Sequence, residues 1–174
     1  MNDLSSSVTA AREFAIKAHG DQKYGKHPYV YHLDKVAEIV RPWGDELMII
    51  AYLHDIMEDT NVMYHRLASQ FGSMVANCVL LMTDVSRADR ETKKRLANVD
   101  FSNAGWDNYP ALIVKAADRL ANVTESVSTG NTAKLEMYRA EHAEFWAAAY
   151  RPMLCNQIWT ALDSLLNHTA CETP

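Results

Sequence analysis

The sequence predicts an all-α fold. Apolar residues recur at the helical spacing of three and four along nearly the whole 174-residue chain. No stretch of five or more residues alternates convincingly between apolar and polar side chains, as a half-buried strand would. The composition, 48% hydrophobic and 22% charged, is ordinary for a globular protein with a sizeable core. We therefore expect one helical domain over residues 1–174, with its core between about residues 8 and 167.

The first half of the chain divides into helices at its glycines, prolines and serines. The first helix is expected to start after Ser5 to Ser7, where a serine can cap the free amides, and to stop at Gly20. Residues 21–29 then form a loop. Proline and glycine separate most of the helices that follow. We expect these helices over residues 32–41, 45–58, 63–71 and 72–82.

The second half contains a long helix between less regular stretches. The charged stretch DVSRADRETKKR leads into NVDFSNAGWDNYP, which we expect to be the main irregular segment. The run ALIVKAADRLANVTESV is strongly helical and places Asp118 and Asn122 one turn apart on the same face. Two more helices are expected over residues 133–149 and 152–167.

Charge, hydropathy and cysteine content exclude several classes of protein. The net charge of −5 lacks the basic footprint of a nucleic-acid binder, so no nucleic-acid partner is expected. No apolar run is long enough to cross a bilayer, and the N-terminus has no apolar signal region, so we expect a cytoplasmic protein without membrane contact. Cys78, Cys155 and Cys171 are far apart and odd in number, which predicts two packing thiols and one in a tail.

Residues 53–60, LHDIMEDT, place four ionisable groups directly after an apolar run. In a continuous helix His54 shares a face with Glu58, and Asp55 with Asp59. Three carboxylates this close repel one another unless they face water, pair with cations or surround a metal ion. A solvated acidic helix end is the competing explanation for this stretch.

Two residues elsewhere in the chain favour the metal ion. His32 lies where the loop enters a helix, and Asp118 lies in an apolar helical run where an unpaired carboxylate would be costly. Each has a structural explanation by itself, and Asp118 has Lys115 nearby. Together with His54 and Asp55 they supply two imidazoles and two carboxylates. This donor set suits a divalent ion such as Mn²⁺ and leaves positions open for water and substrate.

In this order the motifs resemble those of the HD-domain superfamily of metal-dependent phosphohydrolases, and within it the RelA/SpoT-type small alarmone hydrolases. The matching stretches span most of the chain and are AREFAIKAHGDQ, HPYVYHLDKVAEIV, AYLHDIMEDT, FGSMVANCVLLMTDV and VKAADRLANV. The resemblance implies an all-α HD-type bundle. It also implies hydrolysis of the 3′-pyrophosphate of guanosine or adenosine alarmones such as (p)ppGpp, with release of pyrophosphate. The expected partner is a small nucleotide, and self-association is left open.

The resemblance also implies roles for single residues. One Mn²⁺ ion per chain would be held by His32, His54, Asp55 and Asp118. Glu58 and Asp59 would form the catalytic pair that activates the attacking water and handles its proton. The implied substrate-binding residues are Lys23, Tyr24, Asn122, Lys93, Lys94 and Tyr138.

The sequence departs from the family in the loop before His32. Alarmone hydrolases commonly carry an adjacent Arg-Lys pair there, which packs on the purine and approaches phosphate, whereas this chain has Lys23 and Tyr24. Tyrosine removes a charge but keeps a flat surface on which either purine can stack. We therefore expect weakened discrimination between guanine and adenine.

Two other functions remain as alternatives. One is a different HD-fold nucleotide phosphohydrolase, either a dinucleotide 2′-phosphatase or a nucleotidase, and the pair Glu58 and Asp59 argues against it. The other is a non-catalytic binding or inhibitor module that has kept the fold. A pure scaffold has no physical need for so many clustered carboxylates, so the sequence favours the enzyme.

Overall fold

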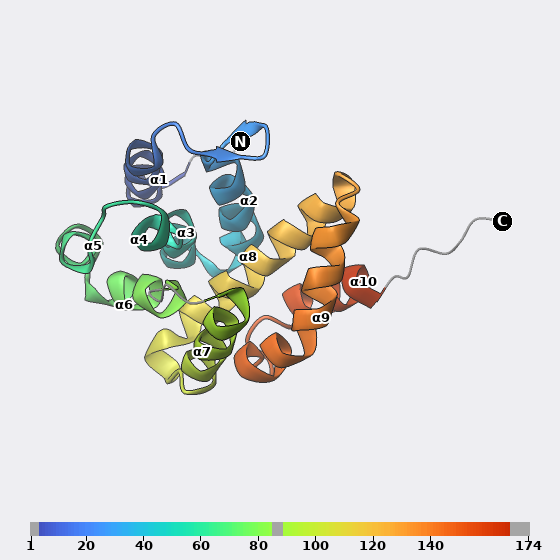
Figure 1. The fold of residues 1–174 in the computed structure, drawn as a ribbon. Helices are drawn as coiled ribbons and strands as arrows, with labels where there is room; N and C mark the ends of the chain where they lie inside the picture. Colours follow the sequence, from blue (N-terminus) through green and yellow to red (C-terminus); the bar gives the residue numbers. More distant parts are fainter. Residues whose placement is uncertain (1–3, 85–88, 168–174) are drawn as a thin grey trace.

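The computed structural model describes residues 4–84 and 89–167 (Figure 1). The described residues are mainly helical, which confirms the predicted fold class. The only strands in these ranges form a small antiparallel hairpin, β1 (Lys23–Tyr24) with β2 (His27–Pro28). The helices are α1 (Ser6–His19), α2 (Val30–Val40), α3 (Asp45–Leu53), α4 (Ile56–Asp59), α5 (Tyr64–Phe71), α6 (Ser73–Met82), α7 (Arg90–Ser102), α8 (Tyr109–Ser128), α9 (Thr132–Ala149) and α10 (Asn156–Asn167). There are also two short 3-10 helices, η1 (Arg41–Trp43) and η2 (Trp106–Asn108).

Helix α8 crosses the middle of the molecule, with α1 to α6 gathered on one side and α9 and α10 on the other (Figure 1). It packs against α2, α3, α6, α9 and α10. Small residues on α8 allow these neighbours to approach closely. Its buried residues are Ala111, Leu112, Ile113, Val114, Ala116, Ala117, Arg119, Ala121, Val123 and Ser126. Any polar side chain on the inner face of α8 therefore lies at the centre of the fold.

Helix α3 is the most deeply buried helix on the N-terminal side of the molecule. Leu47, Ile50 and Leu53 are buried, and the helix is apolar around most of its circumference, as expected for a core helix. It packs against both α1 and α2. Burying each of these large aliphatic side chains contributes about 1.5 to 3 kcal/mol. The end of α3 is therefore a firm base for the residues that follow it.

The predicted limits of the first helix are confirmed. The side chain of Ser5 caps α1 by accepting a hydrogen bond from the Val8 amide at 3.4 Å. The helix ends at Gly20, whose φ of 54° lies in the region that favours glycine. The loop predicted over residues 21–29 contains the two-residue strands of the hairpin, which are too short for an alternating pattern to predict.

The prediction of one helix over residues 45–58 is wrong. Helix α3 ends at Leu53, His54 and Asp55 form a turn, and α4 is a separate single turn of helix. At Asp55 the backbone has φ −96° and ψ −1°, in the bridge region where active-site residues are often found. His54 and Glu58 therefore do not share one helical face: His54 is buried, whereas Glu58 is exposed.

The irregular segment predicted over NVDFSNAGWDNYP is also largely helical. Asp89 caps α7 by accepting a hydrogen bond from the Thr92 amide at 2.9 Å, and the helix continues to Ser102. Phe101, near its end, is buried edge to face against Phe145 of α9. This packing between helices favours the helix where the local sequence does not. Residues 85–88 of the preceding charged stretch lie outside the described ranges.

Cys78 and Cys155 are buried and free, as predicted for packing thiols, and Cys171 lies outside the described residues. Among the helices of residues 4–84 and 89–167, none combines the length and the apolar character needed to cross a membrane.

Candidate active site

Four side chains from three parts of the fold meet at the centre of the molecule. His32 comes from α2, His54 and Asp55 from the turn after α3, and Asp118 from the middle of α8. His32 Nε2 lies 3.2 Å from Asp118 Oδ1 and 3.8 Å from Asp55 Oδ2. His54 Nε2 lies 2.9 Å from Asp55 Oδ2 and 3.8 Å from Asp118 Oδ1. Nitrogen and oxygen donors thus surround one small volume.

The two histidines turn their Nε2 atoms toward this volume. His54 Nδ1 lies 2.7 Å from the Ala51 carbonyl oxygen, which can only accept, so Nδ1 carries the hydrogen and Nε2 is left as the donor to a ligand. His54 Nε2 is buried and makes no hydrogen bond. Both histidines are at most 2% exposed. The buried Nε2 of His54, without a hydrogen-bond partner and beside two carboxylates, fits a divalent cation well.

Each carboxylate in the cluster is held by a further donor. The Tyr29 hydroxyl donates to Asp55 Oδ2 at 2.6 Å. Lys115 Nζ lies 3.1 Å from Asp118 Oδ2, and Asn122 Nδ2 donates to Asp118 Oδ1 at 2.5 Å. Such outer partners orient the groups that bind a metal ion.

The charges of the cluster shift one another's pKa values. Burial alone would lower the pKa of His54, but Asp55 and Asp118 outweigh it and raise the pKa to about 10. Burial opposes ionisation of Asp118, yet Lys115 and the two histidines hold its pKa well below the usual range. The two carboxylates therefore stay ionised and demand a positive charge beside them, which a divalent ion supplies more fully than a proton.

Glu58 and Asp59 stand on α4, beside the cluster. Glu58 accepts a hydrogen bond from the Asp84 amide at 3.3 Å, and Asp59 accepts one from Gln22 Nε2 at 2.9 Å. Although Glu58 is exposed overall, partial desolvation of its carboxylate raises the pKa of Glu58, and the Asp84 amide only partly offsets this effect. A carboxylate with a raised pKa is a better proton acceptor near neutral pH.

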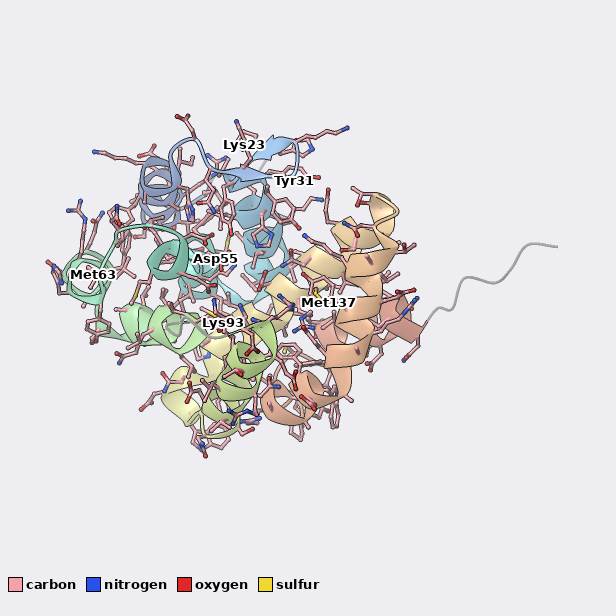
Figure 2. All side chains as sticks on the ribbon, viewed as in Figure 1. Lys23, Tyr31, Asp55, Met63, Lys93 and Met137 are labelled. Atoms are coloured by element: carbon pink, nitrogen blue, oxygen red, sulfur yellow. The ribbon has the colours of Figure 1, made fainter. Side chains whose placement is uncertain are left out.

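Of the residues predicted to bind substrate, Tyr24 and Asn122 lie next to the cluster. The Tyr24 ring stacks on His32, with ring centres 4.7 Å apart and 15° between the planes. Its hydroxyl donates to Asn122 Oδ1 at 2.8 Å. Lys23 is exposed on the hairpin, and in the view of Figure 2 Asp55 lies between Lys23 and Lys93 of α7.

The remaining predicted substrate residues are farther from the donors or already paired. Lys94 Nζ forms an ion pair with Asp84 Oδ2 at 3.1 Å, and Lys93 is half-buried on the same helix. Tyr138 is buried, with the Arg119 guanidinium 4.9 Å from the centre of its ring. The structure thus does not bring Lys93, Lys94 and Tyr138 into the cluster itself.

A hollow of about 580 Å³ opens beside Tyr24, between the hairpin and the loop that joins α8 to α9. Lysines face it from both sides, Lys23 and Lys26 from the hairpin and Lys134 from α9. Its size suits a small-molecule ligand, and the lysines favour one with negative charge.

Sequence reasoning missed Tyr29 and Gln22 and treated Lys115 only as an ion-pair partner. The spacing of Lys115 and Asp118 on one helix face was a usable signal for their contact. Tyr29 and Asp55 are 26 residues apart, and Gln22 and Asp59 are 37 apart. No local pattern in one sequence indicates contacts of that kind.

The chain is similar to a known domain family and to several known proteins. The HD domain family matches residues 11–149. A guanosine-3′,5′-bis(diphosphate) 3′-pyrophosphohydrolase MESH1 from Danio rerio is 32% identical over 136 residues, covering 72% of each protein. The protein of the same name from Xenopus tropicalis is 30% identical over 132 residues, again covering 72% of each.

A guanosine-3′,5′-bis(diphosphate) 3′-pyrophosphohydrolase from Aquifex aeolicus is also similar, being 30% identical over 122 residues. That match covers 68% of this chain but spans only 18% of the length of the Aquifex protein.

The fold is shared with solved structures. One, from a study titled "A metazoan ortholog of SpoT hydrolyzes ppGpp and plays a role in starvation responses", superposes with a TM-score of 0.79 at 20% identity. The superposition covers 95% of this chain and 96% of the other. A Listeria monocytogenes structure superposes with a TM-score of 0.62 over 80% of this chain and 98% of its own.

Proposed function

Because this chain belongs to the HD domain family, and within it to the RelA/SpoT-type alarmone hydrolases, we propose that it hydrolyses the 3′-pyrophosphate of purine alarmones such as (p)ppGpp. The reaction releases pyrophosphate and uses one Mn²⁺ ion held by His32, His54, Asp55 and Asp118. The observation that carries the proposal is the convergence of these four donors next to two further acids, Glu58 and Asp59.

Removing pyrophosphate from a ribose 3′-oxygen requires a nucleophilic water and neutralisation of phosphate charge. A divalent ion in this site supplies both, by lowering the pKa of a water and by polarising a phosphate oxygen. The other steps fall to the side chains of this chain. Glu58, whose pKa is raised, is assigned as the proton acceptor for the attacking water. Asp59, held by Gln22, is assigned to guiding that water.

The nucleoside is assigned to the hollow beside Tyr24. Its ribose would approach Asn122, which one turn of α8 separates from Asp118. The base would pack near the Tyr24 ring, and the 5′-phosphates would meet the lysines around the hollow. The 3′-pyrophosphate then points toward the cluster, because Tyr24 lines the hollow and also contacts both His32 and Asn122.

A product analysis tests the proposal. The purified protein is loaded with Mn²⁺ and incubated with guanosine and adenosine nucleotides that carry or lack a 3′-pyrophosphate, while pyrophosphate and orthophosphate are measured separately. Pyrophosphate release from only the 3′-pyrophosphorylated nucleotides is the expected result. Orthophosphate release from a 2′-phosphorylated dinucleotide or a nucleoside monophosphate would instead favour the related phosphatase chemistry. An Asp118→Asn variant is the control for contaminating hydrolases.

A further inference from the structure

We infer that Tyr29 is a positioning residue, whose hydroxyl group holds the Asp55 carboxylate in the orientation that binds the metal ion. The inference rests on the proposed function, because it takes Asp55 to be a metal ligand. Tyr29 is neither one of the four proposed metal ligands nor one of the two acids on α4.

The contact between Tyr29 and Asp55 is short and directional. The Tyr29 hydroxyl donates to Asp55 Oδ2 at 2.6 Å, the distance of a strong hydrogen bond to a charged acceptor. The same oxygen lies 2.9 Å from His54 Nε2. The hydroxyl therefore acts on the carboxylate oxygen that faces the histidines. A bond to this oxygen restricts rotation of the carboxylate about Cβ–Cγ and thereby also fixes the direction of the second oxygen.

The Tyr29 ring is itself fixed in place. It stacks on His19 at the end of α1, with ring centres 4.4 Å apart and 18° between the planes. His19 is buried, and its Nδ1 lies 2.9 Å from Gln22 Oε1. The Tyr29 amide also donates to the Gln22 carbonyl oxygen at 3.1 Å. A phenol held on both its ring and its backbone can direct its hydroxyl without further loss of freedom on metal binding.

Asp55 needs an external support more than the other carboxylate of the cluster does. Asp118 stands in the middle of α8, where the helix sets its direction, and is also held by Lys115 and Asn122. Asp55 lies in the turn between α3 and α4, outside both helices. Removing an outer partner of a metal ligand typically weakens metal binding about 10- to 100-fold.

The test is a titration of the metal-free protein with Mn²⁺ alone, comparing wild type with Tyr29→Phe. The variant keeps the ring and its stacking on His19 and removes only the hydroxyl. We expect its Kd for Mn²⁺ to rise about 10-fold or more while its helical content is retained. Tyr31→Phe is the matched control, because the Tyr31 hydroxyl donates to Glu125 instead and the variant should bind Mn²⁺ as wild type does.

A second comparison shows whether the effect passes through Asp55. In an Asp55→Ala background, Tyr29→Phe should cause no further loss of Mn²⁺ affinity, because the group that it positions is gone. An equal loss in both backgrounds would mean a general structural effect and would overturn the inference. So would an unchanged Kd in the single variant. Wild-type protein that fails to bind Mn²⁺ would overturn the proposed function as well, and the two failures are thereby distinguished.

Discussion

The cluster proposed to bind the metal ion and the rim proposed to face the substrate, which comprises Lys23, Tyr24, Lys93 and Lys94, are held in different ways. In the cluster, His32 and His54 are buried and each carboxylate has its own supporting donor. On the rim, Lys23 is exposed and Lys94 is occupied by Asp84. The core of the protein thus sets the geometry of the cluster before any ligand arrives, whereas the rim is left to adjust to the substrate. Binding of the ion and binding of the nucleotide should therefore respond to different mutations.

Removing a donor from the cluster should have the largest effect. We expect His32→Ala or Asp118→Asn to weaken Mn²⁺ binding by more than the ~100-fold typical of an outer partner, and to abolish hydrolysis with it. Elemental analysis of the purified proteins checks this. Wild type should contain about one Mn²⁺ per chain. Asp163→Asn, which removes a carboxylate paired with His142 far along the chain, should keep its metal. Full metal content in the Asp118 variant would refute the site.

Removing the cation beside the cluster should come next. Lys115→Met leaves only the histidines to offset the carboxylates of Asp118 and Asp55, and we expect a loss of about 3 to 5 kcal/mol in the stability of the metal-free protein. Mn²⁺ should restore more of the melting temperature in this variant than it adds to wild type, because the ion replaces the lost positive charge. Lys35→Met, which breaks a more exposed pair with Glu125, should cost less than about 1 kcal/mol. Equal melting temperatures for the two variants would mean that the cluster is not charge-balanced by Lys115.

Neutralising the acids of α4 should separate turnover from metal binding. We expect Glu58→Gln and Asp59→Asn to fold, to bind Mn²⁺ and to lose about 100-fold or more in kcat, the scale of a positioned acid or base. Glu38→Gln, a surface change next to Arg41, is the matched control. Near-normal rates in both active-site variants would leave LHDIMEDT as a metal-binding stretch that ends in a solvated helix.

Changes on the rim should be the mildest and should depend on the substrate. We expect Tyr24→Ala to raise KM for guanosine and adenosine substrates alike. The rise should correspond to a loss of about 1 to 3 kcal/mol in binding free energy, the value of one lost stack. Lys23→Ala should cost more as the substrate carries more phosphate, and less at high salt, because an exposed charge is screened. Base preference is measured by letting the guanosine and adenosine nucleotides compete for the enzyme in one reaction and comparing their rates of hydrolysis. A preference above about 100-fold would indicate hydrogen bonds to the base edge in place of stacking.

The sequence was a good guide wherever the signal was periodic or local. Helix α8 and the cap of α1 were predictable because apolar spacing and a serine cap act within a few residues. The break in the helix at His54 and Asp55 was not predictable, because neither proline nor glycine marks it. The end of helix α7 packs through Phe101 on Phe145, a contact that exists in the folded chain alone and that no local pattern predicts.

In the site, too, some residues could be predicted from the sequence and others could not. The convergence of His32, His54, Asp55 and Asp118 could be predicted from residue type and order, since the donor set needed for a divalent ion is restrictive. Tyr29 could not be found in this way, because a tyrosine near a helix start has many ordinary roles. Tyr138 has a buried ring against Arg119, and its contact with substrate stays a prediction.

The turn between α3 and α4 also bears on how this site could be altered. In an unbroken helix, neighbouring residues point about 100° apart, so the His54 and Asp55 side chains would diverge. The turn brings His54 Nε2 and Asp55 Oδ2 within 2.9 Å and places Glu58 and Asp59 on a helix of their own beside them. A one-residue insertion at this joint would rotate α4 as a whole and carry the buried Ile56 out of the core together with the two acids. The length of the joint is therefore fixed by the core as well as by the site, and a graft of the motif into another helical scaffold would have to bring the joint with it.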